Sequence, residues 1–177
     1  MPRQANIYGG GANTNANGLT FEQTTSLNEF LIQNGYTINE DYSVSINGIT
    51  VGVSINKAKL STVFLRNHGI NYLDINSKRW EPDEAFVNYT NNTVYIIEKK
   101  FQNGGGSVDE KLATFPFKKL EYEKLFHPLG FQVEYMYLLS REWFSRPQYN
   151  DYYAYMDANN CSHYFGDEFT LSAIGLI

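Results

Sequence analysis

Residues 82–101 have the sequence PDEAFVNYTNNTVYIIEKKF, and this stretch decides the fold. Apolar, aromatic and β-branched residues fill its two halves, and a run of Thr and Asn separates them. We expect a β-hairpin with one strand at 85–89, a turn at 90–93 and the returning strand at 94–101. Such a hairpin brings the start of its first strand beside the end of its second.

Charged side chains stand at the end of the returning strand. Side chains alternate between the two faces of a strand, so Val94 and Ile96 are expected in the core. Glu98 and Lys100 continue the same face toward its rim, whereas Lys99 lies on the opposite face as their outward neighbour. Burying charges is costly unless they are paired or bind a metal. The alternation therefore predicts a functional carboxylate and ammonium at this edge of the sheet.

The hairpin also places Asp83 beside Glu98, and two carboxylates supply the hard oxygen ligands that Mg²⁺ prefers. A bound Mg²⁺ polarises a phosphate, activates water and stabilises the leaving oxygen. Lys100 could neutralise charge that develops on the phosphate or orient the attacking water. An ion pair with Glu98 is the structural alternative for Lys100. A bare Glu-x-Lys pattern occurs often by chance, and Asp83 across a recognisable turn strengthens it.

Pro82-Asp83 followed by Glu98-Lys99-Lys100 resembles the PD-(D/E)XK signature of restriction-endonuclease-like nucleases. The signature covers residues 82–100, and the order of helix, meander, helix and strand fits the family over residues 19–139. The resemblance implies an α/β fold with an α/β/α core, in which helices flank a central mixed β-sheet. It also implies cleavage of double-stranded DNA with Mg²⁺, for which Mn²⁺ could substitute.

The resemblance assigns metal binding to Asp83 and Glu98 and a catalytic role to Lys100. Many members place an acidic residue of the first helix near the metal, and Glu22 is the matching residue here. Residues 9–22 and 98–112 also resemble parts of small restriction-enzyme-like proteins. Gln102 shares the face of Lys100 and could contact phosphate or a metal-bound water, with a solvent-facing amide as the equal alternative.

Four lysines between residues 111 and 124 form a mildly basic patch in an acidic protein. Lys111 and Lys118 are expected on one helix face if the kink at Pro116 is mild, and Lys119 and Lys124 add to the patch. Contacts from lysine to phosphate supply much of the affinity of proteins for DNA. We therefore expect Lys111, Lys118 and Lys119 to bind DNA, with a solvated helix face as the alternative for each single lysine.

The rest of the chain supplies the elements of one domain spanning residues 1–177. Residues 1–18 are rich in Gly and Asn and indicate a flexible entry, and the glycine run at 9–11 lacks the Walker pattern. The patterns predict a helix at 19–34, a meander at 42–75 around Asn47-Gly48, a helix from 107 that is interrupted at Pro116 and resumes to 126, a strand at 131–139, a short helix at 149–156 and a last strand or packed tail at 169–177.

Composition limits the class of protein. The 177 residues are 42% hydrophobic and 19% charged, which is enough apolar material for a core. The net charge of −5 argues against binding nucleic acid through a broad basic surface, but a carboxylate site can still use cations to offset the charge of a phosphate. Cys161 is the single cysteine, so no intrachain disulfide is possible. Without a signal-like or membrane-length apolar run, we expect a soluble, cytoplasmic protein with no membrane partner.

Three functions remain in competition. The first is a type II restriction endonuclease that cuts a short specific sequence in duplex DNA as a homodimer. The second keeps the fold but acts on branched or damaged DNA, as junction resolvases and repair nucleases do. The third is a nonenzymatic DNA-binding or interaction protein, in which the acidic residues lie apart at a solvated turn. The separation of the Asp83 and Glu98 carboxylates discriminates the third from the others.

Overall fold

The computed structural model describes residue 21, residues 24–102 and residues 108–177. The predicted flexible entry at 1–18 therefore lies outside the described residues.

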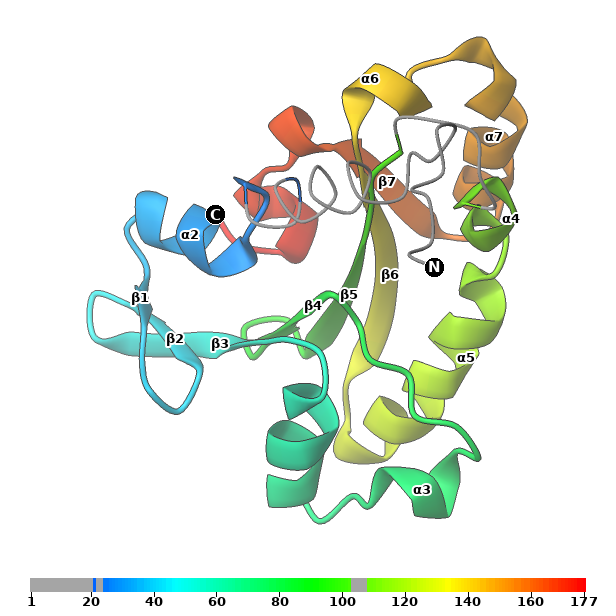
Figure 1. Ribbon diagram of the computed structural model, residues 1–177. Helices are drawn as coiled ribbons and strands as arrows, with labels where there is room; N and C mark the ends of the chain where they lie inside the picture. The colour runs from blue at the N-terminus through cyan, green and yellow to red at the C-terminus, as the bar shows by residue number, and fades with distance from the viewer. Residues whose placement is uncertain (1–20, 22–23, 103–107) are drawn as a thin grey trace, which may run out of the picture.

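A seven-stranded mixed sheet forms the centre of the molecule, and its strands lie in the order in which they occur in the chain (Figure 1). The strands from β1 to β5 pair antiparallel, whereas β6 is parallel to β5 and β7 is parallel to β6. The strands are β1 (Thr37–Ile38), β2 (Ser43–Ile46), β3 (Ile49–Ile55), β4 (Glu84–Asn88), β5 (Thr93–Lys100), β6 (Gln132–Leu139) and β7 (Cys161–Phe165). The expected α/β class with a mixed sheet is confirmed.

Both predicted hairpins are present. Asn47 and Gly48 have φ angles of 51° and 77°, the left-handed conformation that a two-residue type I′ turn needs. In the second hairpin Val87 pairs with Val94 across β4 and β5. Because these strands are antiparallel, the start of β4 lies beside the end of β5. The end of β6 reaches the same edge because β6 runs parallel to β5.

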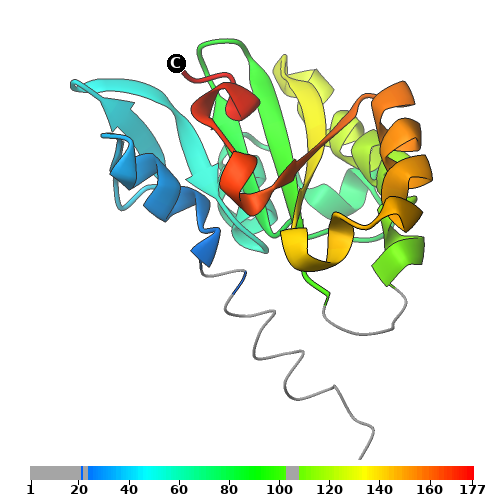
Figure 2. The same cartoon turned by 90° about the horizontal axis from the view of Figure 1, so that it is seen from above.

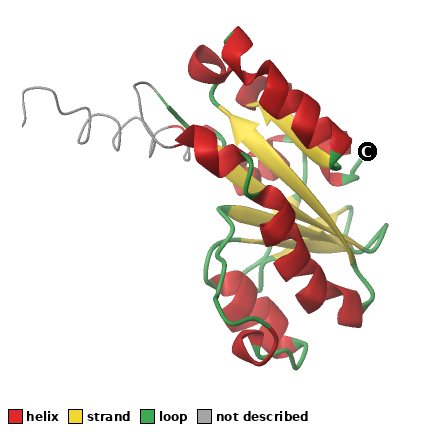
Figure 3. Cartoon of the chain, turned by 90° about the vertical axis from the view of Figure 1, so that its right-hand side faces the viewer, coloured by secondary structure: helices red, strands yellow, loops and turns green. Residues whose placement is uncertain are grey.

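Helices cover both faces of the sheet (Figures 2 and 3). One face packs against α2 (Leu27–Gln33) and the 3-10 helix η5 (Leu171–Ile174). The other face carries the connections of the parallel strands together with the helices that follow β3. These elements are the π-helix η1 (Leu60–Leu65), α3 (Tyr72–Ile75), α4 (Val108–Leu112), α5 (Phe115–Phe126), η2 (His127–Leu129), α6 (Arg141–Phe144), η3 (Pro147–Tyr149) and α7 (Asn150–Ala158). Between β7 and η5 lies the short η4 (Gly166–Glu168).

Strand β5 separates two hydrophobic cores and follows the predicted alternation. Val94 and Ile96 belong to the core beneath α5, and Tyr95 and Ile97 belong to the core beneath α2. Glu98 lies on the α5 face as well, because residues 94, 96 and 98 alternate onto the same face of the strand.

Several elements differ from expectation. The helix predicted at 19–34 is interrupted at residues 25 and 26: residues 21 and 24 are helical, and α2 begins at Leu27, where Ser26 caps it by accepting a hydrogen bond from the Glu29 N–H at 3.4 Å. Residues 56–75 form η1 and α3 rather than further strands of the meander. Strand β7 was not predicted. Of the two alternatives for residues 169–177, the packed tail is found, since it forms η5 and buries Ile174 and Leu176 in the core. Within the described ranges, none of the helices has the length and apolar character needed to cross a membrane.

Candidate active site

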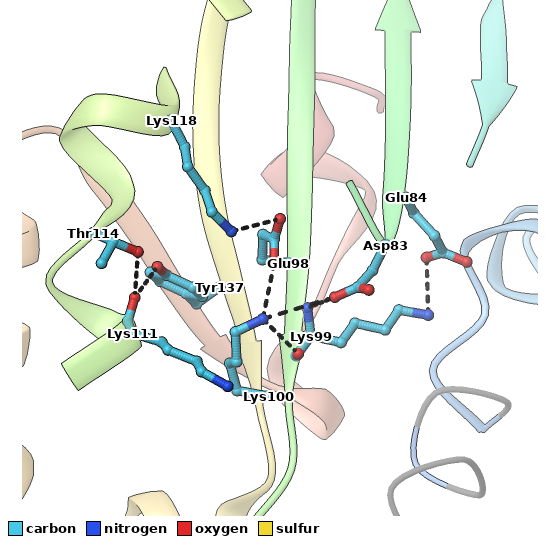
Figure 4. A network of polar contacts seen from close by, with 9 residues as sticks. All are labelled: Asp83, Glu84, Glu98, Lys99, Lys100, Lys111, Thr114, Lys118 and Tyr137. Carbon is cyan, nitrogen blue, oxygen red and sulfur yellow. Dashed lines mark hydrogen bonds and ion pairs between the residues drawn. The ribbon is translucent and has the colours of Figure 1, made fainter. Parts of the chain in front are cut away.

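Charged side chains gather where β4 begins and β5 ends. Asp83 immediately precedes β4, and Glu98 and Lys100 lie within the last three residues of β5. Figure 4 shows their side chains converging on the α5 side of the sheet. The structure thus brings together the three residues on which the sequence prediction depended.

The ammonium group of Lys100 is surrounded by oxygen atoms. Its Nζ lies 2.8 Å from Glu98 Oε2, 3.0 Å from the main-chain oxygen of Lys99 and 3.9 Å from Asp83 Oδ2. One cation therefore contacts both carboxylates. The carboxylates do not lie apart at a solvated turn, because a single ammonium group is within ion-pair distance of each.

Glu98 is the buried member of the site, with an exposed fraction of 6%. Its Oε1 accepts a hydrogen bond of 3.3 Å from Lys118 Nζ of α5, which forms a second ion pair. Burial alone would raise the pKa of Glu98, but the charges and hydrogen bonds of Lys100 and Lys118 together hold that pKa below its usual value. The Glu98 side chain is therefore a carboxylate at neutral pH despite its burial.

Asp83 faces the opening of the site. Its Oδ2 accepts a hydrogen bond of 2.7 Å from the Lys99 backbone N–H, which fixes the carboxylate against the end of β5. The side chain of Asp83 remains 25% exposed, compared with 7% for Glu98. A ligand arriving from solvent would meet Asp83 first and Glu98 beneath it.

The opposite face of β5 carries a second, separate ion pair. Lys99 is only 7% exposed, and its Nζ lies 3.0 Å from Glu84 Oε2. The Glu84 carboxylate also accepts hydrogen bonds from the Leu27 N–H at the start of α2, at 3.0 Å. Burial raises the pKa of Glu84, and the neighbouring Lys99 partly offsets that rise. Lys99 thus points away from the site, as its parity predicts, and ties β5 to α2.

The predicted DNA-binding residues separate into two groups. Lys118 reaches Glu98, and Lys111 lines the same pocket as Lys100 and Lys118. Lys119 points elsewhere, because consecutive residues on a helix lie about 100° apart. Its Nζ contacts Asn160 O at 3.2 Å and Glu134 Oε2 at 3.9 Å.

Two further predicted residues have different outcomes. Gln102 follows the end of β5 and is 6% exposed, so the alternative of a solvent-facing amide is wrong. Its N–H donates to Ser140 Oγ at 3.4 Å, which ties the chain to the end of β6. Glu22 lies outside the described residues.

An open pocket of about 680 Å³ adjoins the carboxylates. Three lysines and three aromatic side chains line it: Lys100, Lys111, Lys118, Trp80, Phe117 and Tyr155. The sequence did not place these aromatic residues together, because they come from three separate segments of the chain, and the tyrosine-rich segment 149–155 was expected in the core rather than as a base-stacking surface. A further signal was Phe117, an apolar residue directly before the lysine pair at 118 and 119.

The oxygen atoms around Lys100 fit a hard divalent cation. Two carboxylates and a main-chain carbonyl are the ligand types that Mg²⁺ takes, and Mg²⁺ usually retains several waters in addition. The described residues contain no group of three or more His, Cys, Asp and Glu side chains that could hold a metal ion. A metal here would therefore rest on Asp83 and Glu98, and water or substrate phosphate would complete its shell.

Comparisons of this chain with known protein families, with characterised proteins and with solved structures find no match.

Proposed function

We propose that this chain is a Mg²⁺-dependent endodeoxyribonuclease that hydrolyses phosphodiester bonds of double-stranded DNA. The observation that carries the proposal is the contact of one ammonium group with both the Asp83 and Glu98 carboxylates beside a pocket lined by lysines. The pairing of Pro82-Asp83 with Glu98-Lys99-Lys100 and the helices on both faces of a mixed sheet support a restriction-endonuclease-like core.

The residues have distinct roles in this proposal. Asp83 and Glu98 would hold Mg²⁺, or Mn²⁺ in its place, and a bound ion would supply positive charge to the scissile phosphate and lower the pKa of water. Lys100 donates hydrogen bonds to a phosphate oxygen or to the attacking water. Lys118 remains paired with Glu98 and keeps that buried carboxylate ionised.

Local charge reconciles this activity with the acidic composition. The chain carries a net charge of −5, but three lysines meet at the pocket beside the site. Interactions between charges fade over about 10 Å at moderate salt, so a phosphate in the pocket responds to these lysines, to the two site carboxylates and to their bound cation rather than to the net charge of the chain. We therefore expect DNA binding to be confined to this edge of the sheet and to weaken steeply as salt is raised.

A type II restriction endonuclease that acts as a homodimer is the specific form of the proposal. Cutting both strands of a duplex at a symmetric sequence calls for two copies of one small site related by a twofold axis. Discrete fragments from a large linear duplex would support this form. Cleavage restricted to branched DNA would instead assign the chain to the structure-selective nucleases.

The experiment is digestion of plasmid and of a large mixed-sequence DNA with Mg²⁺. We expect the wild type to cut, EDTA to abolish cutting and Mn²⁺ to restore it. Asp83→Asn and Lys100→Met should each reduce the rate by at least about a hundredfold, the usual loss when a charge-stabilising group is removed from an active site. Lys59→Met is the matched control, because Lys59 is exposed and its ammonium group lies over the Tyr42 ring rather than in the site.

The outcome separates the hypotheses cleanly. Equal cleavage by the wild type, Asp83→Asn and Lys100→Met would remove these residues from the chemistry. Binding of DNA without cleavage under any metal would identify a nonenzymatic binding protein, in which Lys100 serves only as the ion-pair partner of Glu98.

A further inference from the structure

The pocket beside the site is lined by aromatic rings that are partly exposed. Phe117 is 57% exposed and Tyr155 is 42% exposed, although many other rings of this chain are fully buried. Trp80 packs edge-on against Phe117, with ring centroids 6.1 Å apart and planes 80° apart. Exposed apolar rings grouped around a hollow indicate a binding surface rather than packing.

Ammonium groups lie over the Trp80 ring and along the pocket. Lys118 Nζ lies 5.5 Å from the centre of the Trp80 ring while it also contacts Glu98, and Lys78 Nζ lies 4.2 Å from the same ring. Lys100 and Lys111 line the pocket with Lys118, and its described lining contains no carboxylate. The ligand that this surface fits is therefore flat, apolar on its faces and attached to negative charge.

A nucleotide has these properties. Its base stacks on aromatic side chains, and its phosphate binds ammonium groups. The pocket volume of about 680 Å³ lies within the usual range of about 300–1,000 Å³ for small-molecule sites, so one base with its sugar has room. A base that stays stacked within a duplex cannot enter such a pocket, because its faces are covered by its neighbours.

We propose that the pocket of Trp80, Phe117 and Tyr155 binds one unstacked nucleobase of the DNA substrate. The proposal rests on the nuclease function above and specifies its substrate class: double-stranded DNA in which a nucleotide next to the bond that is cut is unpaired or can be flipped out of the helix. Lys100 and Lys118 connect the two parts, because both line the pocket and both contact Glu98. A base held by the rings thus places its own phosphate near the carboxylates.

The test compares binding of three labelled duplexes that share one flanking sequence. One has a single unpaired adenine, one has an abasic nucleotide at the same bulge, and one is fully paired. Fluorescence anisotropy in EDTA measures affinity without cleavage. We expect the unpaired adenine to bind at least about fivefold more tightly than either other duplex, which corresponds to ~1 kcal/mol for one stacked base.

Variants assign that preference to the pocket. Phe117→Ala and Tyr155→Ala should each remove most of the preference for the unpaired adenine, and Phe117→Tyr should retain it because a ring remains. Tyr89→Ala is the matched control, since Tyr89 is 40% exposed but directly follows β4, at the opposite end of that strand from Asp83. Circular dichroism establishes that the variants are folded.

Several results would overturn the inference. These are equal binding or no binding of the three duplexes by the wild type, equal binding of the adenine and abasic bulges, and an unchanged preference in both alanine variants. If such a result accompanied Mg²⁺-dependent cleavage, the nuclease function would stand and the pocket assignment would fail. If the chain preferred the unpaired adenine but cleaved no DNA under any metal, the pocket assignment would stand and the nuclease function would fail.

Discussion

Replacing Lys99 by Met tests whether neighbouring lysines of β5 have separate tasks. Lys99 and Glu84 form an ion pair of 3.0 Å between largely buried side chains, on the opposite face of the strand from Lys100. Met preserves much of the length and apolar character of the lysine side chain but removes its charge. Among the described residues, Glu84 would then keep its hydrogen bonds to the start of α2.

The expected cost is large for a single substitution. Two unit charges 3.0 Å apart at an effective dielectric constant of about 20 attract by ~5.5 kcal/mol. Part of this is offset because Lys99 no longer has to lose its hydration. We therefore expect a loss of about 3 kcal/mol in the free energy of unfolding, at the lower end of what breaking a buried pair usually costs.

Urea unfolding followed by circular dichroism at pH 7 measures the loss. For a domain of this size we expect the midpoint to fall by about 1–2 M urea. Adding Glu84→Gln to Lys99→Met should recover most of the lost stability, because the amide still accepts a hydrogen bond from the Leu27 N–H but carries no charge.

Lys100→Met provides the contrast at the adjacent position. It should remove cleavage while costing less stability than Lys99→Met, because Glu98 keeps Lys118 as its partner. A Lys99→Met variant as stable as the wild type would show that the ion pair does not stabilise the fold. A double variant with Glu84→Gln that recovered no stability would show that the loss does not come from the unpaired Glu84 charge.

Three further predictions concern other parts of the fold. Burial lowers the pKa of His163, and the charges of Asp157 and Glu168 oppose that shift, so protonation favours the unfolded chain. The free energy of unfolding should therefore fall as the pH drops below 6.5 toward the lowered pKa. His163→Phe should flatten this dependence in urea titrations between pH 7 and 5. Burial raises the pKa of Cys161 to about 12, so the thiol of the folded chain should resist a thiol reagent at pH 8 and react once the chain is unfolded. Rapid reaction of the thiol in the folded chain would contradict its burial. A Cβ at Gly52 would overlap the main-chain oxygen of residue 87, so Gly52→Ala should cost about 3 kcal/mol in thermal or urea unfolding, and an unchanged midpoint would contradict this packing.

The hairpin half of the site could be predicted because its causes are local. Alternation along β5 and a short turn place Asp83 beside Glu98 and send Lys99 to the other face, without knowledge of any distant segment. The positive φ angles of Asn47 and Gly48 are likewise inherent in those two residue types. Local chemistry therefore specified the strands that hold the carboxylates.

The remainder depends on how distant segments pack. Lys118 contacts Glu98 only because α5 crosses back over the sheet, and the rings of Trp80, Phe117 and Tyr155 meet through three different elements. The spacing of apolar residues along the sequence does not indicate such contacts between distant segments. Strand β7 escaped prediction for another reason: its five residues, Cys161–Phe165, mix small, polar and aromatic types without a clear alternation.

The order of the sheet has a consequence for folding. Each strand pairs with the strands before and after it in the chain, so the sheet can grow at one edge without inserting a strand between two others. The antiparallel half closes short loops, whereas each parallel pairing must wait for a helical crossover, which is slower. Asp83, Glu98 and Lys100 should thus meet early, and Lys118 should join them later. Pulse-labelling hydrogen exchange would reveal this as protection of β4 and β5 before β6 and β7, and simultaneous protection would exclude it.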